Sequence, residues 1–298
     1  MKRLMIALLM MVLIMCISSC GGGGGTDSGS LPISPVVVVN TPLYGFYASA
    51  DNPNDLTLPL DPTIKTSVEE TANFVNVVMV GHWKGETEII SDSQKSVELG
   101  VTKLIVPVLN YYNPNTSRFE GVLNLLNDMR NLGLLQYVVA VYPIDEPNVN
   151  NPAGDFGAAL DDLRAQLDTM DDTKNIKLFS IYGPVRFGFA NIQKYDWVGY
   201  DDYDLRDTVF ATIDSTVRPL LKPGAKIVLV PGGFTPYQQD PASFYTYAQT
   251  HADVALIMPF IWIDVKANDI SGIRSNPTRQ IYINLGCAIV GKPSACAS

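Results

Sequence analysis

Short, almost uninterrupted runs of apolar residues recur along the chain from about residue 42 onward. Clear examples occupy residues 75–80, 104–106, 138–141, 227–230 and 255–258. Such runs, rich in Val, Ile and Leu, are typical of strands that are buried on both faces, as in a parallel sheet. With less regular segments they predict eight strands, which start near Tyr44, Phe74, Leu104, Val138, Lys177, Asp196, Lys226 and Val254.

Between these strands the apolar residues change to a helical spacing. Most strand starts are about thirty residues apart, which is the length of a strand plus a crossover helix. Three apolar stripes at helical spacing are Phe119, Val122, Leu123, Leu126 and Met129; Phe156, Leu160, Leu163, Leu167 and Met170; and Val209, Phe210, Ile213, Val217 and Leu220. Gly133 stands where the first helix is expected to end. The interval from the fifth strand to the sixth is short, which predicts an abbreviated helix.

Eight strand–helix units predict an α/β protein with a single (β/α)8 barrel over residues 42–298. The roughly 255 residues of this segment match the ~250 that are typical of one such barrel. An open, doubly wound sheet is the alternative. That fold usually carries a Gly-rich phosphate turn after its first strand, and Tyr44-Gly45-Phe46-Tyr47 is not such a turn.

The N-terminus differs in character from the rest of the chain. Lys2 and Arg3 precede an apolar run over residues 4–17, which ends in Ser18-Ser19-Cys20. A basic start, an apolar segment and small residues before a cut predict a secretory signal over residues 1–19. The apolar run is shorter than the ~20 residues that a membrane-spanning helix needs. Residues 20–41 consist of Cys20, five glycines and a further segment, and they are expected to form a flexible tether.

The stretch Ile17-Ser18-Ser19-Cys20 resembles the lipobox of bacterial lipoproteins. This resemblance implies cleavage before Cys20 and a lipid on that cysteine, so the membrane is an expected partner. Gly21, in place of Asp, favours the outer membrane by resemblance to Gram-negative sorting rules. A plain secreted protein is the alternative.

Charge and cysteine content narrow the possible partners. Loss of the signal lowers the basic residues from 21 to 19 against 30 acidic ones, which gives a net charge of −11. This balance argues against nucleic acid as a partner. Cys287 and Cys296 remain near the C-terminus, and in an exported protein they are expected to form one disulfide loop. Too few ligands surround them for zinc, and no metal or other cofactor is expected.

Candidate chemistry lies where the predicted strands end, because the active sites of such barrels lie at the C-terminal ends of the strands. Aromatic and carboxylate residues are frequent there. Aromatic faces stack on sugar rings, and carboxylates protonate or attack glycosidic bonds. The residues expected to bind a carbohydrate are Tyr47, His82, Trp83, Asn110, Tyr111, Tyr200, Tyr203 and Trp262.

At this level the chain resembles the barrel glycoside hydrolases of clan A. Asp145-Glu146-Pro147 follows the fourth strand, where that clan carries its acid/base in an Asn-Glu-Pro motif. Trp262 follows the eighth strand, where the clan often places a Trp under the sugar, and Tyr200-Asp201-Asp202-Tyr203 follows the sixth. The resemblance implies that Glu146 is the general acid and Asp145 its partner.

The chain departs from this clan at the seventh strand. The clan has a nucleophilic Glu there, whereas this chain reads Val230-Pro231-Gly232-Gly233-Phe234. Asp145-Glu146 also resembles the adjacent Asp-Glu pair of hexosaminidases that use a substrate acetamido group in place of the nucleophile. This resemblance implies that Asp145 orients that group, and Tyr200 or Tyr203 could then hold its oxygen. Asp201 or Asp202 could instead activate water in an inverting reaction. The third alternative is a barrel that binds glycans without turnover.

Overall fold

The computed structural model describes residues 40–47, 63–81, 84–150, 156–205 and 208–292. The chain separates into two compact units, residues 1–36 and residues 37–298. The first unit lies outside the described residues, so the signal sequence and Cys20 remain predictions. Everything below concerns the second unit.

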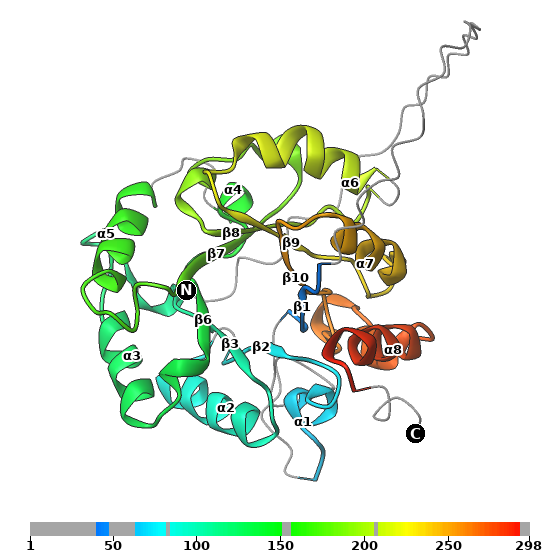
Figure 1. Cartoon of the computed structure of the whole chain (residues 1–298), viewed down its shortest axis with the longest axis horizontal. Helices are drawn as coiled ribbons and strands as arrows, with labels where there is room; N and C mark the ends of the chain where they lie inside the picture. Colours follow the sequence, from blue (N-terminus) through cyan, green and yellow to red (C-terminus); the bar gives the residue numbers. More distant parts are fainter. Residues whose placement is uncertain (1–39, 48–62, 82–83, 151–155, 206–207, 293–298) are drawn as a thin grey trace, which may run out of the picture. The chain divides into compact units, whose positions relative to one another are not determined.

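Eight parallel strands form a barrel in this unit, as the sequence predicts (Figure 1). They are ordered β1-β10-β9-β8-β7-β6-β3-β2. The strands are β1 (Leu43–Tyr44), β2 (Val77–Met79), β3 (Lys103–Pro107), β6 (Val138–Tyr142), β7 (Lys177–Tyr182), β8 (Trp197–Tyr200), β9 (Lys226–Leu229) and β10 (Val254–Ile257). The predicted single (β/α)8 barrel is therefore confirmed, and the doubly wound alternative is excluded.

The barrel closes between β1 and β2 through one residue, Asn76. No strand ladder joins these two strands among the described residues. Instead the Tyr44 amide donates a 2.8 Å hydrogen bond to the Asn76 side chain, and the Asn76 amide donates a 3.0 Å bond to the Tyr44 carbonyl. Asn76 thus replaces a strand pair at the seam.

Helices surround the barrel strands (Figure 1). The longer helices are α2 (Glu86–Glu98), α3 (Val122–Asn131), α5 (Gly157–Leu167), α7 (Pro241–Thr250) and α8 (Arg279–Val290). Three shorter helices are α1 (Ser67–Thr71), α4 (Pro147–Asn150) and α6 (Val209–Thr212), and η5 (Ile213–Val217) continues α6 as a π-turn. Only the single turns η3 (Val185–Phe187) and η4 (Ile192–Lys194) connect β7 to β8, which confirms the abbreviated helix.

The predicted helical stripes need small corrections. Phe119 precedes α3 and belongs to a two-stranded hairpin of β4 (Tyr112–Asn113) and β5 (Arg118–Phe119). Leu125 is fully buried in α3, whereas Leu123 is only half-buried. Leu220 is 37% exposed, because it follows the π-turn, which changes the direction in which later side chains point.

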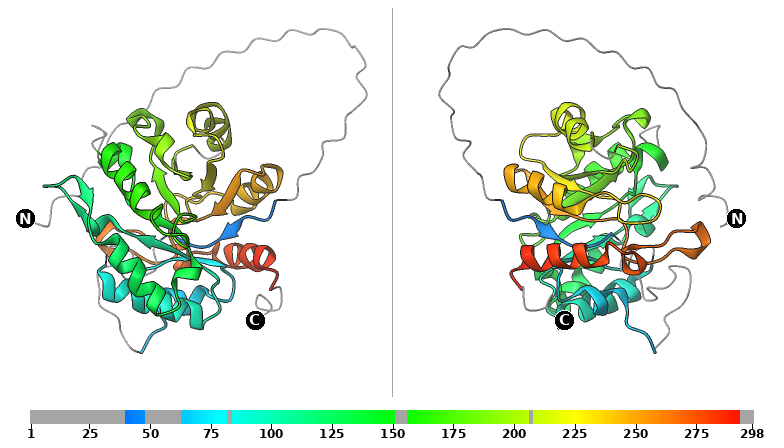
Figure 2. Two further views of the ribbon diagram at one scale, coloured as in Figure 1. Left: turned by 60° about the vertical axis from the view of Figure 1, so that its left-hand side comes forward. Right: turned by 90° about the vertical axis from the view of Figure 1, so that its right-hand side faces the viewer.

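Helix α8 packs very close to β1, beside the seam (Figure 2). A side chain at Gly286 would lie 2.3 Å from the Phe74 carbonyl oxygen, so only glycine permits this approach. The Tyr44 hydroxyl donates a 2.9 Å bond to the Tyr282 carbonyl of the same helix. Cys287 is buried in α8, and Cys296 lies outside the described residues, so their disulfide stays a prediction.

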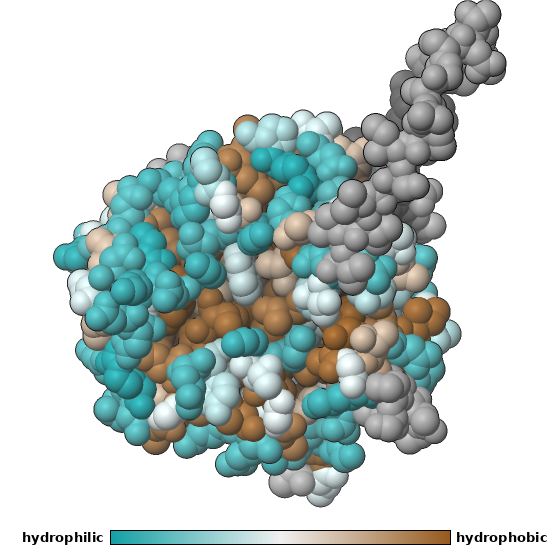
Figure 3. All heavy atoms as spheres, in the orientation of Figure 1, coloured by the Kyte–Doolittle hydropathy of each residue, from teal (hydrophilic) through white to brown (hydrophobic). Residues whose placement is uncertain are grey.

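Hydrophobic residues occupy the centre of the face in Figure 3 and hydrophilic residues surround them. The strands supply a core of side chains that are almost completely buried. Among the described residues, none of the helices has both the length and the apolar character to cross a membrane.

Candidate active site

Asp145 and Glu146 follow β6 and immediately precede α4, at the C-terminal end of the barrel strands. Glu146 has a φ of 42°, in the left-handed region that non-glycine residues seldom adopt. The amides of Val149 and Asn150 both bond the Glu146 carbonyl at 2.9 Å, and the Asn150 side chain bonds the Asp145 carbonyl. The start of α4 therefore holds Glu146 in a backbone conformation that costs about 1–3 kcal/mol, a feature often found at functional sites.

Two tyrosines fix the Asp145 carboxylate. The Tyr142 hydroxyl donates a 2.5 Å hydrogen bond to Asp145 Oδ1, and the Tyr47 hydroxyl also donates to this carboxylate. Burial raises the pKa of Asp145, and the two tyrosine hydrogen bonds oppose this rise because they stabilise the ionised form. Asp145 is thus a positioned, hydrogen-bonded carboxylate.

The Glu146 carboxyl group differs from Asp145, because no described side chain donates a hydrogen bond to it. It is half-buried against the end of β7, where a Cβ on Gly183 would lie 3.0 Å from Glu146 Oε1. Burial, and then the neighbouring Asp145 charge, raise the pKa of Glu146 to about 7. A carboxyl group with this pKa is protonated for a large fraction of the time at neutral pH.

Asp201 follows β8 and brings a third carboxyl group to the same place. It is 9% exposed, and the Tyr203 hydroxyl donates a 3.0 Å bond to its Oδ2. Its Oδ1 is buried without a hydrogen-bond partner among the described residues. Burial, followed by the charges of Glu146 and Asp145, raises the pKa of Asp201 well above its ordinary value.

Asp202 makes different contacts from Asp201. Tyr200, which is almost completely buried, donates a 3.3 Å bond to Asp202 Oδ2. Asp202 also interacts with Asp204 and Arg186, and its pKa is raised mainly by burial. The sequence could not choose between Asp201 and Asp202, and the structure brings Asp201, not Asp202, to Asp145 and Glu146. The Tyr200 hydroxyl therefore bonds Asp202 and not one of the three clustered carboxyl groups.

Aromatic rings line the space beside Asp201. The Tyr203 ring is stacked on Phe260, with centroids 5.8 Å apart, and meets Phe234 edge-on at 5.1 Å. Tyr47 lies 5.1 Å from the same Phe260 ring. The Tyr203 ring fits here because Gly232, after β9, has no Cβ, which would lie 2.9 Å from Tyr203 Cδ1. The predicted sites Tyr47 and Tyr203 therefore lie in this aromatic wall.

Phe234 and Phe260 are the two residues of this wall that the sequence did not single out, and Phe260, not Trp262, lies against Tyr203. The Trp262 ring is 0% exposed and packs between Phe46 and Phe74, at 5.0 and 5.5 Å. Its Nε1 donates a 2.9 Å bond to Glu70 on α1. The prediction that Trp262 offers a face to a sugar is therefore corrected, because its neighbours cover that face.

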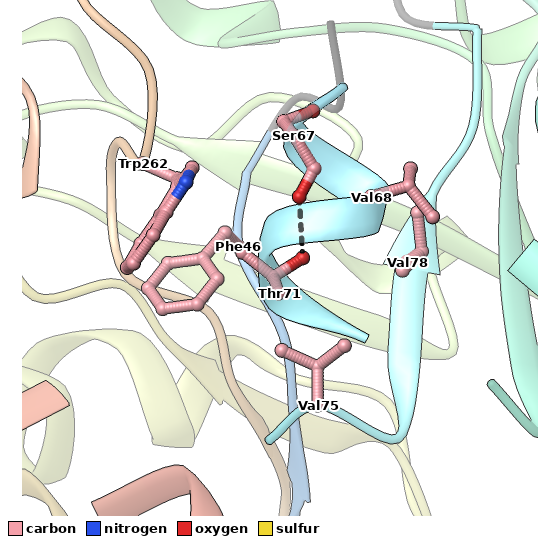
Figure 4. A pocket seen from close by; sticks show the side chains of 7 residues that line it. All are labelled: Phe46, Ser67, Val68, Thr71, Val75, Val78 and Trp262. Carbon is pink, nitrogen blue, oxygen red and sulfur yellow. Dashed lines mark hydrogen bonds between the residues drawn. The ribbon is translucent and has the colours of Figure 1, made fainter. Parts of the chain in front are cut away.

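The hollow that Trp262 and Phe46 border is small and mostly apolar (Figure 4). Within α1, which lines it, the Thr71 hydroxyl donates a 2.8 Å hydrogen bond to the Ser67 carbonyl. This hollow lies beside α1 and β2 and includes none of the clustered carboxyl groups. It belongs to the packing of the barrel.

The remaining predicted sugar contacts bond to other groups or lie outside the described residues. The Tyr111 hydroxyl donates a 3.3 Å bond to Glu86 at the start of α2. Asn110 is exposed and donates to the Lys84 carbonyl at 2.8 Å. His82 and Trp83 lie outside the described residues, so their roles stay predictions.

The cluster of Asp145, Glu146 and Asp201 has no cationic partner in the described part of the chain, because every ion pair found there joins other residues. No group of acidic, His or Cys side chains in these ranges has the arrangement of a metal site. At the end of β9 the Gly232 amide donates 2.7 Å to the Gln239 side chain, and no carboxylate stands at that point. The cluster can therefore supply protons and bind hydrogen-bond donors.

No model of a known protein family matches this chain, and no curated protein matches it either. Several solved structures are similar in fold at low identity. The glycoside hydrolase family 17 β-1,3-glucanosyltransferase from Rhizomucor miehei is 12% identical, with 80% of this chain and 92% of that chain covered and a TM-score of 0.47. The GH113 β-mannanase from Alicyclobacillus acidocaldarius is 11% identical, with 84% and 87% covered and a TM-score of 0.41.

Proposed function

We propose that this barrel is a glycoside hydrolase that cleaves an O-glycosidic bond in a carbohydrate, with Glu146 as general acid. The observation that carries this proposal is the state of the Glu146 carboxyl group. It is half-buried at the C-terminal end of the strands, has a pKa of about 7 and lies beside two further carboxyl groups. General acids need a pKa near the working pH, and such barrels place their chemistry at this end.

The proposed reaction begins with proton transfer from Glu146 to the oxygen of the leaving sugar. The glycosidic bond then breaks through a transition state with positive charge on the sugar ring. Asp145, which two tyrosines hold in place, provides negative charge close to that ring. Tyr203 and Phe260 offer aromatic surface on which a sugar ring can rest.

Asp201 is the second carboxyl group of the proposed mechanism. The end of β9 holds no carboxylate, so the usual covalent intermediate lacks its nucleophile. Asp201 is buried beside Glu146 with an unpaired oxygen, which suits a group that positions water or a substrate substituent. The two alternatives are an inverting reaction and attack by a group on the substrate itself.

The same absence of a carboxylate after β9 favours one alternative function, a glycan-binding protein without turnover.

We further propose that the protein is exported and anchored by lipid on Cys20, most simply in the outer membrane. The sequence Ile17-Ser18-Ser19-Cys20 supports this anchor. Replacement of Cys20 by Ser should release the protein from the membrane fraction, and retention of the variant there would exclude the lipid anchor.

The experiment that tests catalysis is hydrolysis of a glycan panel by the wild-type protein and by Glu146→Gln, with products resolved by chromatography. Gln keeps the shape of the side chain and cannot donate the proton. We expect a loss of about 10²–10⁴-fold in kcat/KM, the usual contribution of a general acid. Undiminished turnover by the variant would exclude the acid role, and binding without turnover in both proteins would favour the alternative function.

A further inference from the structure

The three carboxyl groups of the cluster have no basic side chain paired with them in the described part of the chain. Asp145, Glu146 and Asp201 raise one another's pKa or are raised by burial, and no Lys or Arg in the described ranges pairs with them. Buried charges are normally paired, because the loss of water around an isolated charge costs several kcal/mol. The raised pKa values mean that Glu146 and Asp201 keep their protons when no ligand is bound, and a positively charged ligand would stabilise their ionised forms, which a neutral ligand would not.

Asp201 shows where in the cluster a ligand could donate a hydrogen bond. Its side chain is nine-tenths buried, and Oδ2 is occupied by the Tyr203 hydroxyl. Oδ1 has no donor among the described residues, although a buried carboxyl oxygen almost always has one. A ligand that supplies an N–H or O–H at this point would complete the hydrogen bonding of Asp201.

The rings beside Asp201 also favour a cation. Tyr203, Phe260 and Tyr47 pack against one another, and the faces of such rings attract positive charge. A neutral sugar could stack here and donate one hydroxyl to Asp201, but it would bring no positive charge to stabilise the ionised carboxyl groups. An ammonium group would satisfy the hydrogen bond and the charge together.

We propose that the sugar unit that enters beside Asp201 carries a positively charged amino group, so that the substrate class is an oligosaccharide of deacetylated amino sugars. This inference rests on the proposed function for the bond that is cleaved, and adds the chemistry of the sugar. The ammonium group donates to Asp201 Oδ1 and lies near the aromatic wall.

The test measures binding by calorimetry at pH 6 in 150 mM salt. Three probes share one linkage and differ at carbon 2 of the sugar, which bears an ammonium, an acetamido or a hydroxyl group: a β-1,4-linked glucosamine pentamer, its fully N-acetylated form and cellopentaose. Galactosamine and galactose form a second pair that does not depend on linkage. We expect each amine to bind at least ten-fold more tightly than its neutral counterparts.

Two variants separate a specific site from general attraction to an acidic protein. Asp201→Asn keeps the shape of the side chain, and it should reduce the preference for the amine to less than three-fold. Asp204→Asn removes the same charge from an exposed position on the same loop, and it should leave the preference unchanged. Equal binding of all probes, preference for the acetamido form, or a preference that survives Asp201→Asn would overturn the inference.

Hydrolysis of the same probes distinguishes this inference from the proposed function. Cleavage of neutral glycans without preference for amines would support the hydrolase and overturn the amino-sugar site. Preference for amines in binding, without cleavage of any glycan, would support the site and overturn the hydrolase. Absence of binding to every probe would overturn the amino-sugar site.

Discussion

The Tyr203 hydroxyl donates a hydrogen bond to Asp201, two residues before it in the chain, with the atoms 3.0 Å apart. This bond satisfies only one oxygen of a carboxyl group that is buried beside Glu146 and Asp145. Asp201 therefore lies in an environment that disfavours its ionised form. The arrangement implies that the folded protein gives up stability in order to keep Asp201 in this position.

Asp201→Asn should stabilise the protein at high pH. The pKa of Asp201 is higher in the folded than in the unfolded chain, so the folded state binds its proton more tightly. The stability of the wild type therefore falls as pH rises above the unfolded value, and Asn cannot ionise. We expect a higher Tm for the variant at pH 8, and a difference that shrinks at pH 4. Asp204→Asn, at an exposed position, is the control, and an equal effect of both variants would refute this account.

The activity should follow the protonation of Glu146. Its pKa of about 7 means that the acid form dominates below neutral pH and disappears above it. Activity, measured as kcat/KM on any cleaved glycan, should thus fall with increasing pH through about 7. The residual activity of Glu146→Gln should lack this limb of the profile. A limb that persists in the variant would assign the titration to another group.

Gly183→Ala should reduce activity with little loss of stability. The new methyl carbon would lie 3.0 Å from Glu146 Oε1 and 2.8 Å from Val149, so the Glu146 side chain must move. Displacement of a catalytic group by a fraction of an ångström to 1 Å can lower the rate by about 10²-fold. Gly85→Ala is the matched control, since its methyl would meet only the flexible end of Glu88 at 3.3 Å. Full activity of Gly183→Ala would show that Glu146 does not need this space.

Glu70 should matter for stability rather than for catalysis. It accepts hydrogen bonds from Trp262 Nε1 at 2.9 Å and from Arg274 Nε at 2.8 Å, and thereby joins α1 to the segment after β10. Glu70→Ala removes the acceptor of the hydrogen bond from the buried Trp262 Nε1, and a buried donor left unpaired typically costs about 1–3 kcal/mol. Urea unfolding should show a loss of this size, whereas Glu98→Ala on the exposed side of α2 should show little change.

The sequence was sufficient for the strands and for the position of Glu146. Continuous apolar runs identify strands without tertiary information, and Asp145-Glu146-Pro147 directly follows one of them. The aromatic wall was only partly predictable. Phe260 and Trp262 both follow β10. Trp262 is the buried one because it packs on Phe74 and bonds Glu70, which precede it by almost two hundred residues.

The choice between Asp201 and Asp202 was also beyond the sequence. Adjacent residues in extended chain point in opposite directions, so a shift of one residue exchanges them. The observed direction depends on the room that Gly232 leaves for Tyr203, and Gly232 follows a different strand, β9. Sequence pattern identifies the loop, whereas packing between strands decides which side chain enters the site.

Between β1 and β2 the barrel is joined by Asn76 and not by a strand ladder among the described residues. Elsewhere a row of backbone bonds must break together, but here two bonds to one residue hold the edges. Transient opening should therefore begin at this line, and amide protons of Tyr44 and Asn76 should exchange with deuterium sooner than those of β6 and β7. The barrel would then open between β1 and β2 while the strands opposite Asn76 stay paired.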